Sequence, residues 1–83
     1  LIDGHNDLPW ELRENSGPGF TNIDLTKPQK KFHTDIARLK TGNVGAQFWS
    51  AFVPSSTAKA GTAVKMTLEQ TDVIHGTARR YPL

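Results

Sequence analysis

The stretch from Val44 to Val53 limits the fold of this chain most strongly, because it is almost continuously apolar. Its polar members are Gln47 and Ser50. A strand that is apolar on both faces is typical of a parallel sheet in an α/β protein, where helices cover both sides. We therefore expect a buried parallel strand over residues 44–53.

Residues 1–8 favour a second strand, which Pro9 ends because proline has no N–H for strand pairing. Successive side chains of a strand alternate between its faces, so His5 and Asp7 would share one face, with alpha carbons roughly 6.5 Å apart. Imidazole and carboxylate groups at that spacing can bind one cation. An ordinary structural role stays open, in which Asp7 caps the next turn and His5 is a partly buried, hydrogen-bonded residue.

Little regular structure is expected between this strand and residue 34. Residues 10–13 allow one helical turn, which the run from Asn15 to Gly19 ends because glycine and proline both oppose a helix. Residues 20–32 are expected to form a long loop. A loop of this length is often functional, but a variable surface insertion would have the same composition.

A short helix is expected over residues 35–41. Thr34 is a suitable N-cap, Asp35 places a negative charge in the first turn, and Gly42 suits the position that follows the helix. His33 precedes the cap, and we interpret it as a structural residue.

A long amphipathic helix is expected from the N-cap Thr62 to the residues before Pro82, after a linker or ragged helix entry at 54–61. Its apolar positions recur every three or four residues and define one buried stripe, which Ile74 widens. The stripe consists of Val64, Leu68, Thr71, His75 and Ala78. We therefore interpret His75 as a packed residue, and not as a metal ligand.

These elements follow the order strand, helix, strand, helix, which predicts an α/β fold of the β-α-β-α kind. About 35 residues separate the strands, and this is enough for the crossover that parallel strands need. Two parallel strands cannot cover their own faces, and the 83-residue chain has no cysteine to stabilise a smaller fold. We therefore expect a piece of a larger domain that is aggregation-prone or only partly ordered by itself.

Charge and hydropathy argue against two other classes of protein. The chain has 10 basic and 8 acidic residues, and the basic ones are dispersed apart from Lys30–Lys31 and Arg79–Arg80. This pattern lacks the basic stripe with interleaved aromatic residues that indicates nucleic-acid binding. The chain begins at Leu1 without a signal-peptide pattern and has no apolar run near 18 residues, so a signal peptide or membrane span is expected only outside it.

Four stretches in a fixed order carry a resemblance to a known family. They are LIDGHNDLPW at 1–10, HTDIARL at 33–39, VGAQFWSAFVP at 44–54 and TLEQTDVIHGTARRYP at 67–82. Together they resemble the opening part of the membrane (renal-type) dipeptidases. The resemblance implies that residues 1–83 form the first quarter of a TIM (β/α)8 barrel, the incomplete N-terminal part of a single metallodipeptidase barrel domain.

The resemblance also implies a function, the zinc-dependent hydrolysis of dipeptides by a complete enzyme that holds two zinc ions. His5 and Asp7 match the first two metal ligands of the family, and the remaining ligands and catalytic residues would lie beyond residue 83. Trp10 and Phe52 would contribute to the substrate pocket, although packing is the more usual role of such residues. The 83-residue chain alone is expected to be inactive.

Partners and location follow from the same resemblance. It leaves a homodimer open and suggests an extracytoplasmic or membrane-associated enzyme. Animal members tend to carry a cysteine after the proline of the FWS strand, whereas Ser55 follows Pro54 here. This difference argues against a disulfide-bonded, lipid-anchored ectodomain and favours a microbial member. A second class of function also stays open, a small non-catalytic α/β binding or scaffold module derived from the family.

Overall fold

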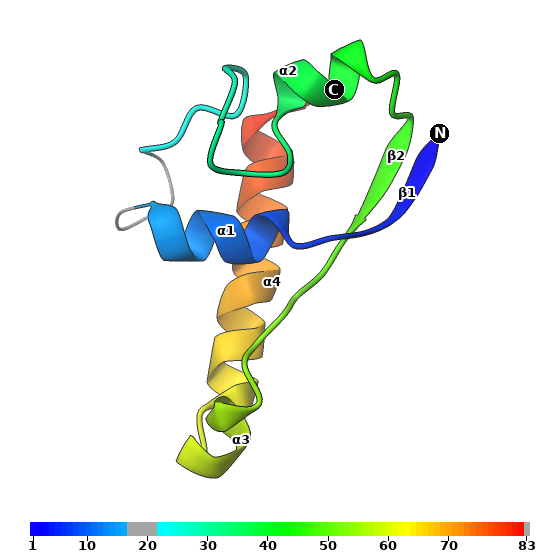
Figure 1. Ribbon diagram of the computed structural model, residues 1–83. Coiled ribbons are helices and arrows are strands. Elements are labelled where there is room, and N and C mark those ends of the chain that lie inside the picture. The colour runs from blue at the N-terminus through cyan, green and yellow to red at the C-terminus, as the bar shows by residue number, and fades with distance from the viewer. Residues whose placement is uncertain (17–21, 83) are drawn as a thin grey trace.

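Figure 1 shows the computed structural model of the chain, which describes residues 1–16 and 22–82. Two short strands lie side by side on one side of the molecule, and the longest helix runs along the other side. The elements are β1 (Ile2–Asn6), α1 (Leu8–Asn15), α2 (Ile36–Thr41), β2 (Ala46–Trp49), α3 (Ser56–Ala60) and α4 (Ala63–Arg80). β1 and β2 pair in parallel, with Ile2 opposite Ala46. The predicted α/β class and the parallel strand pair are therefore confirmed.

The first strand is shorter than predicted, and the helix after it is longer. β1 ends at Asn6, and α1 already begins at Leu8 and makes two turns up to Asn15. Pro9 does not end the strand. It occupies the first turn of α1, where a missing N–H breaks no helical hydrogen bond. The chain leaves the helix at Ser16, and the predicted helix-breaking residues 17–19 lie outside the described part.

The loop that leads into α2 is anchored by a buried carboxylate. Described residues 22–35 contain no helix or strand, which confirms the predicted loop over 22–32, and the short helix begins at residue 36 instead of 35. Residues 20 and 21 lie outside the described part. Asp35 is the N-cap of α2 in place of the predicted Thr34, because its Oδ1 accepts the Arg38 N–H over 2.8 Å. Its Oδ2 accepts the Gln29 N–H over 2.8 Å and the Arg38 guanidinium over 2.6 Å. Asp35 is 0% exposed, so the residue that caps α2 also holds the loop to the interior of the protein.

The second strand has the predicted position but not the predicted length or burial. β2 comprises only Ala46–Trp49, and pairing ends where β1 ends, with a last hydrogen bond from the Ser50 N–H to the Asn6 carbonyl. Phe48 is 66% exposed. The expectation of burial on both faces is therefore wrong for the described chain, which provides too few elements to cover the apolar strand.

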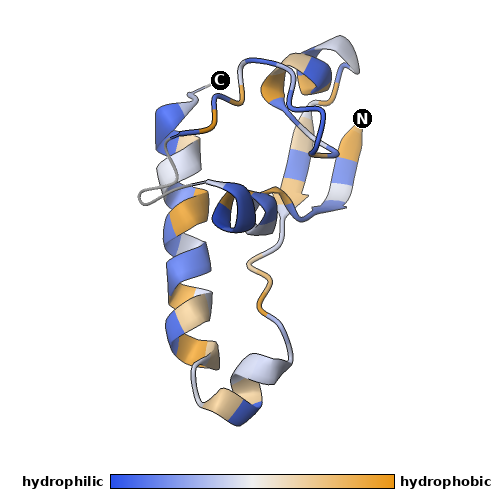
Figure 2. Cartoon of the chain, turned by 60° about the vertical axis from the view of Figure 1, so that its left-hand side comes forward, coloured by the Kyte–Doolittle hydropathy of each residue, from blue (hydrophilic) through white to orange (hydrophobic). Residues whose placement is uncertain are grey.

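The long helix α4 ends at Arg80 as predicted, but it buries a different face. Its buried residues are Gln70, Val73 and Thr77. In the predicted stripe, Val64 and Leu68 are 76% and 64% exposed, and His75 is exposed instead of packed. α1 packs across the other face of α4, while hydrophobic positions recur along the helix from its start to the level of α1 (Figure 2). The periodicity correctly groups residues on one face, yet the cover over that face is not among the described residues.

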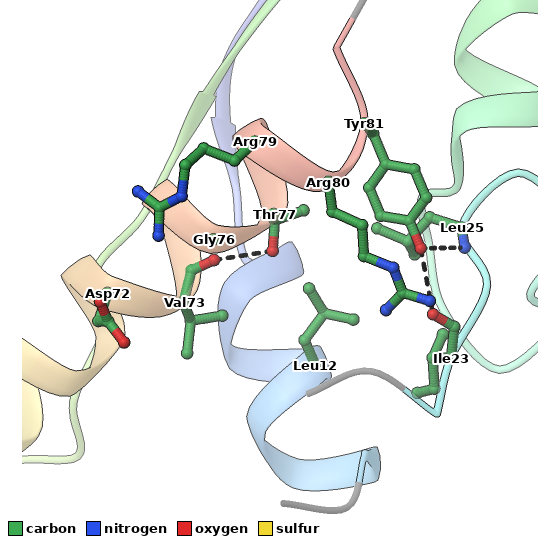
Figure 3. A pocket seen from close by; sticks show the side chains of 10 residues that line it. All are labelled: Leu12, Ile23, Leu25, Asp72, Val73, Gly76, Thr77, Arg79, Arg80 and Tyr81. Carbon is green, nitrogen blue, oxygen red and sulfur yellow. Dashed lines mark hydrogen bonds between the residues drawn. The ribbon is translucent and has the colours of Figure 1, made fainter. Parts of the chain in front are cut away.

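A small core joins α1, the loop, α2 and α4. Its buried apolar residues are Leu8, Leu12, Leu25, Phe32, Ile36 and Val73. Tyr81, the C-cap of α4, closes one end of this core, and Figure 3 shows its hydroxyl between two loop residues. The hydroxyl accepts the Leu25 N–H over 3.1 Å and donates to the Ile23 carbonyl over 3.2 Å.

Among the described helices, none combines the length and apolar character that crossing a membrane requires.

Replacing Tyr81 by phenylalanine is expected to destabilise the full-length protein by about 1–2 kcal/mol, because the buried Leu25 N–H loses its acceptor. The phenylalanine ring keeps the position over which the Arg80 guanidinium lies, 5.2 Å from the centroid, so the change isolates the hydroxyl. Urea unfolding of the wild type and the variant measures the difference. An unchanged free energy of unfolding would show that these two hydrogen bonds contribute nothing.

Candidate metal site

The structure brings His5 and Asp7 together just beyond the carboxyl end of β1. His5 is the second-last residue of the strand, and Asp7 lies between the strand and α1. His5 Nε2 and Asp7 Oδ2 are 3.3 Å apart, and the two side chains are 68% and 50% exposed. The pair is therefore preformed and open to solvent, although Asp7 is no longer part of the strand.

The structure shows neither the side-chain cap that the sequence leaves open for Asp7 nor the partial burial that it leaves open for His5. Asp7 is the N-cap residue of α1, but its side chain makes no capping hydrogen bond. Its backbone carbonyl accepts the Trp10 and Glu11 N–H groups, while the Leu8 N–H donates to the side chain of Asn6. His5 is exposed instead of partly buried. The carboxylate of Asp7 is thus left to face the imidazole.

The separation of the two donor atoms is compatible with a shared zinc ion. Zinc binds imidazole nitrogen and carboxylate oxygen at about 2.0–2.2 Å, and a tetrahedral angle then places the two ligand atoms roughly 3.3–3.5 Å apart. The observed 3.3 Å fits that value and equally fits a hydrogen bond between the two groups. Catalytic zinc usually has three protein ligands. Residues 1–16 and 22–82 contain no group of three or more His, Cys, Asp or Glu side chains that could hold a metal.

His33 lies at the same site, which the sequence interpretation did not anticipate. A pocket of about 240 Å³ is lined by His5, Asp7, Glu11 and His33, together with the loop residues around His33. We interpreted His33 as structural because it only precedes a helix cap, but its side chain is exposed at this pocket. Periodicity could not have placed it, since it lies at the end of a loop whose path is set by long-range contacts.

A hydrogen-bonded carboxylate supports the strand beneath the pair. Asp3 accepts the His5 N–H over 3.2 Å and the Gln47 side-chain amide over 2.7 Å. Gln47 in turn accepts the Trp49 indole N–H over 2.7 Å. The His5 N–H first, and the Gln47 amide second, hold the pKa of Asp3 below its ordinary value. Asp3 therefore stays ionised at neutral pH and links β1 to β2.

Trp10 and Phe52, the predicted substrate-binding residues, contact each other. Their ring centroids are 5.1 Å apart and the rings are nearly perpendicular, at 82°. This edge-to-face arrangement is the one that aromatic pairs favour. The backbone N–H of Trp10 donates to the Asp7 carbonyl, although neither ring lines the pocket at His5.

A larger pocket of about 370 Å³ lies elsewhere, between α1, the loop and the end of α4 (Figure 3). Its walls include core residues such as Leu12 and Val73, with Asp72, Arg79 and Arg80 as its charged residues. It lacks the histidine and the paired donor atoms of the smaller pocket. Of these two pockets, the smaller one is therefore the one that offers an imidazole and a carboxylate side by side.

The sequence also has clear relatives among known proteins. Residues 1–83 match the family model described as membrane dipeptidase, peptidase family M19. The chain is 45% identical over 93 residues to an uncharacterized dipeptidase of Schizosaccharomyces pombe and 43% identical over 82 residues to dipeptidase 3 of Mus musculus. It is 40% identical over 93 residues to the dipeptidase ataJ of Aspergillus terreus. Each alignment covers 99% of this chain but only 22%, 16% and 22% of the respective relative. No solved structure was found to match the chain.

Proposed function

This chain belongs to the membrane dipeptidase family, peptidase family M19, and we propose that it supplies the first two metal ligands of a zinc-dependent dipeptidase. The observation that carries the proposal is the 3.3 Å approach of His5 Nε2 and Asp7 Oδ2 beside an open pocket. The chain spans about a fifth of the length of the curated relatives that it matches. Further ligands would come from chain outside the described residues.

A TIM barrel is the proposed setting of this site. The parallel pair of β1 and β2, the exposed Phe48 and the exposed stripe of Val64 and Leu68 all favour additional strands and helices around the described elements. In such barrels the active site lies at the carboxyl ends of the strands. His5 and Asp7 lie at that end of β1.

In the proposed function, His5 and Asp7 bind the metal. When bound, zinc lowers the pKa of a coordinated water and polarises the carbonyl of the peptide bond. The imidazole of His5 would supply a nitrogen donor, and the carboxylate of Asp7 would supply an anionic oxygen donor that offsets the charge of the cation. Two zinc ions are proposed for the complete enzyme, with the later ligands at the ends of further strands.

Trp10 and Phe52 are proposed to form an apolar wall for a side chain of the dipeptide. Phe52 is 42% exposed, so it leaves apolar surface next to the Trp10 ring.

Replacing Trp10 by alanine in the full-length protein is expected to raise KM for a dipeptide with an apolar side chain about tenfold, because aromatic contact and apolar burial contribute about 1–2 kcal/mol. Dipeptidase kinetics with Leu-Gly and Gly-Gly measure the effect, and Gly-Gly is the control because it has no side chain to lose contact. Equal changes in KM for both substrates would contradict the assignment of a side-chain wall.

The proposed activity is tested by metal removal from the full-length protein. Dialysis against a chelator should abolish hydrolysis of the dipeptide, and addition of zinc should restore it. Calcium or magnesium added instead is the control, because these ions favour oxygen ligands over imidazole. Full-length protein that carries zinc and hydrolyses no dipeptide would favour the non-catalytic binding or scaffold function.

A further inference from the structure

We propose that Asn6, which lies between His5 and Asp7 in the chain, is a positioning residue that holds the Asp7 carboxylate beside the His5 imidazole. The inference rests on the proposed function, because it concerns the same metal pair. Both ends of the Asn6 side chain are in use. Its Oδ1 accepts the Leu8 N–H over 3.0 Å, and its Nδ2 donates to the Thr34 hydroxyl over 2.7 Å.

The bond to Leu8 fixes the backbone of Asp7. It runs from residue 6 to residue 8 and so closes a small ring around Asp7, as Asn side chains commonly do in turns. Asp7 has φ −94° and ψ 25°, a sparsely populated backbone region that such a ring can hold in place.

Because of the same bond, the Asp7 carboxylate does not cap the N-terminus of α1. Aspartate at an N-cap normally turns its carboxylate toward the free N–H groups of the first helical turn. Here Asn6 accepts the first of these N–H groups, from Leu8, and Pro9 has none to offer. The Trp10 N–H donates to the Asp7 carbonyl. The carboxylate is therefore available to His5, and loss of the Asn6 acceptor would leave the Leu8 N–H free beside it.

The bond to Thr34 anchors Asn6 itself. Thr34 is 5% exposed, and it precedes Asp35, which three hydrogen bonds from Gln29 and Arg38 hold in the interior. A hydrogen bond in such buried surroundings is stronger than one in water. The Asn6 amide also donates to Asp3 over 3.4 Å, but the bond to Thr34, 28 residues further along the chain, is the shorter at 2.7 Å. The loop therefore helps to set the direction of the Asn6 side chain, and this direction is transmitted to Asp7.

The inference is tested by the zinc affinity of full-length protein, measured by competition with a chromophoric chelator well below the unfolding temperature. Residues that orient metal ligands typically contribute 10- to 100-fold to affinity, and we expect Asn6→Ala to weaken zinc binding by about that factor. Thr34→Val should weaken binding about tenfold, and Thr34→Ser, which keeps the acceptor oxygen, should restore it to within about twofold. At saturating zinc, the variants should regain most of the wild-type kcat, because the ligands themselves are intact.

Arg13→Met is the matched structural control. Arg13 joins α1 to α4 through hydrogen bonds to Glu69 and Gln70, so its loss costs stability without reaching the metal pair. Zinc affinity that is unchanged in Asn6→Ala, with a lowered unfolding temperature as in Arg13→Met, would overturn the inference. If the double variant His5→Ala/Asp7→Asn loses zinc while Asn6→Ala does not, only the inference about Asn6 fails. If that double variant binds zinc like the wild type, the proposed function fails and the inference with it.

Discussion

Replacing Asp7 by asparagine in the full-length protein is expected to abolish dipeptide hydrolysis and to lower the zinc content. Asparagine keeps the size of the side chain and one oxygen acceptor, but it removes the negative charge that faces His5. Substitution of residues that only support metal ligands typically costs about 10- to 100-fold in activity, so the loss of a direct ligand should exceed about 100-fold. The measurement is the rate of dipeptide hydrolysis together with zinc per protomer, and His5→Ala should give the same result.

Two carboxylates in the same chain provide matched controls. Asp72→Asn makes the same chemical change at an exposed position on α4 and should leave both rate and zinc content unaltered. Asp3→Asn should affect activity less than Asp7→Asn, because Asp3 accepts hydrogen bonds from His5 N–H and Gln47 instead of facing the imidazole. Wild-type activity and unchanged zinc in Asp7→Asn would contradict the assignment of Asp7 as a ligand.

The second large effect is expected on stability, from replacing Asp35 by asparagine. The carboxylate accepts two backbone N–H groups and the Arg38 guanidinium, and an asparagine amide would turn a donor toward one of them. The Arg38 side chain is 45% exposed, and solvent screens its charge. We therefore expect a loss of about 2 kcal/mol in the free energy of unfolding at pH 7, mainly from the unsatisfied N–H groups.

This stability difference should depend on pH in one direction. Burial raises the pKa of Asp35, but the hydrogen bonds from Gln29 and Arg38 outweigh it and hold the pKa below its ordinary value of 3.8. A carboxylate whose pKa is lower in the folded than in the unfolded state stabilises the fold above the ordinary pKa, and this contribution is lost as the pH falls through the folded-state value.

Urea unfolding of wild type and Asp35→Asn at pH 7, 5 and 3 measures the pH dependence. The difference between the two proteins should be equal at pH 7 and 5 and smaller at pH 3. Asp72→Asn, which changes an exposed carboxylate of α4, is the control and should show little difference at any pH. A difference for Asp35→Asn that stays constant down to pH 3 would show that its ionised form is not favoured by folding.

The sequence was sufficient for the order of β1, α2, β2 and α4, because local signals define them, but not for the full extent of α1 or for α3. The apolar run around Phe48, the regular spacing in α4 and the helix end before Pro82 each appear in the structure. Local signals were not sufficient to predict which residues are buried. Val64 and Leu68 share a helix face as predicted, but burial requires a neighbour, and α1 covers the opposite face of α4. The cap of α2 shows a similar limit, since Thr34 and Asp35 both suit an N-cap and a hydrogen bond from the Gln29 N–H, six residues earlier in the loop, favours Asp35.

The candidate site was predictable only in part. His5 and Asp7 could be paired because residues two positions apart in the sequence cannot lie far apart in space. The structure places their donor atoms together. His33 could not be paired with them, because its approach depends on the path of a loop. The role proposed for Asn6 could not be predicted from the sequence either, since its partner Thr34 lies 28 residues away.

The most direct test of the central claim is X-ray diffraction from crystals of the full-length protein, recorded on both sides of the zinc absorption edge. We predict an anomalous peak within about 2.0–2.2 Å of His5 Nε2 and of a carboxylate oxygen of Asp7. A fully occupied zinc ion bound by other residues, with His5 and Asp7 still paired only to each other, would contradict the claim.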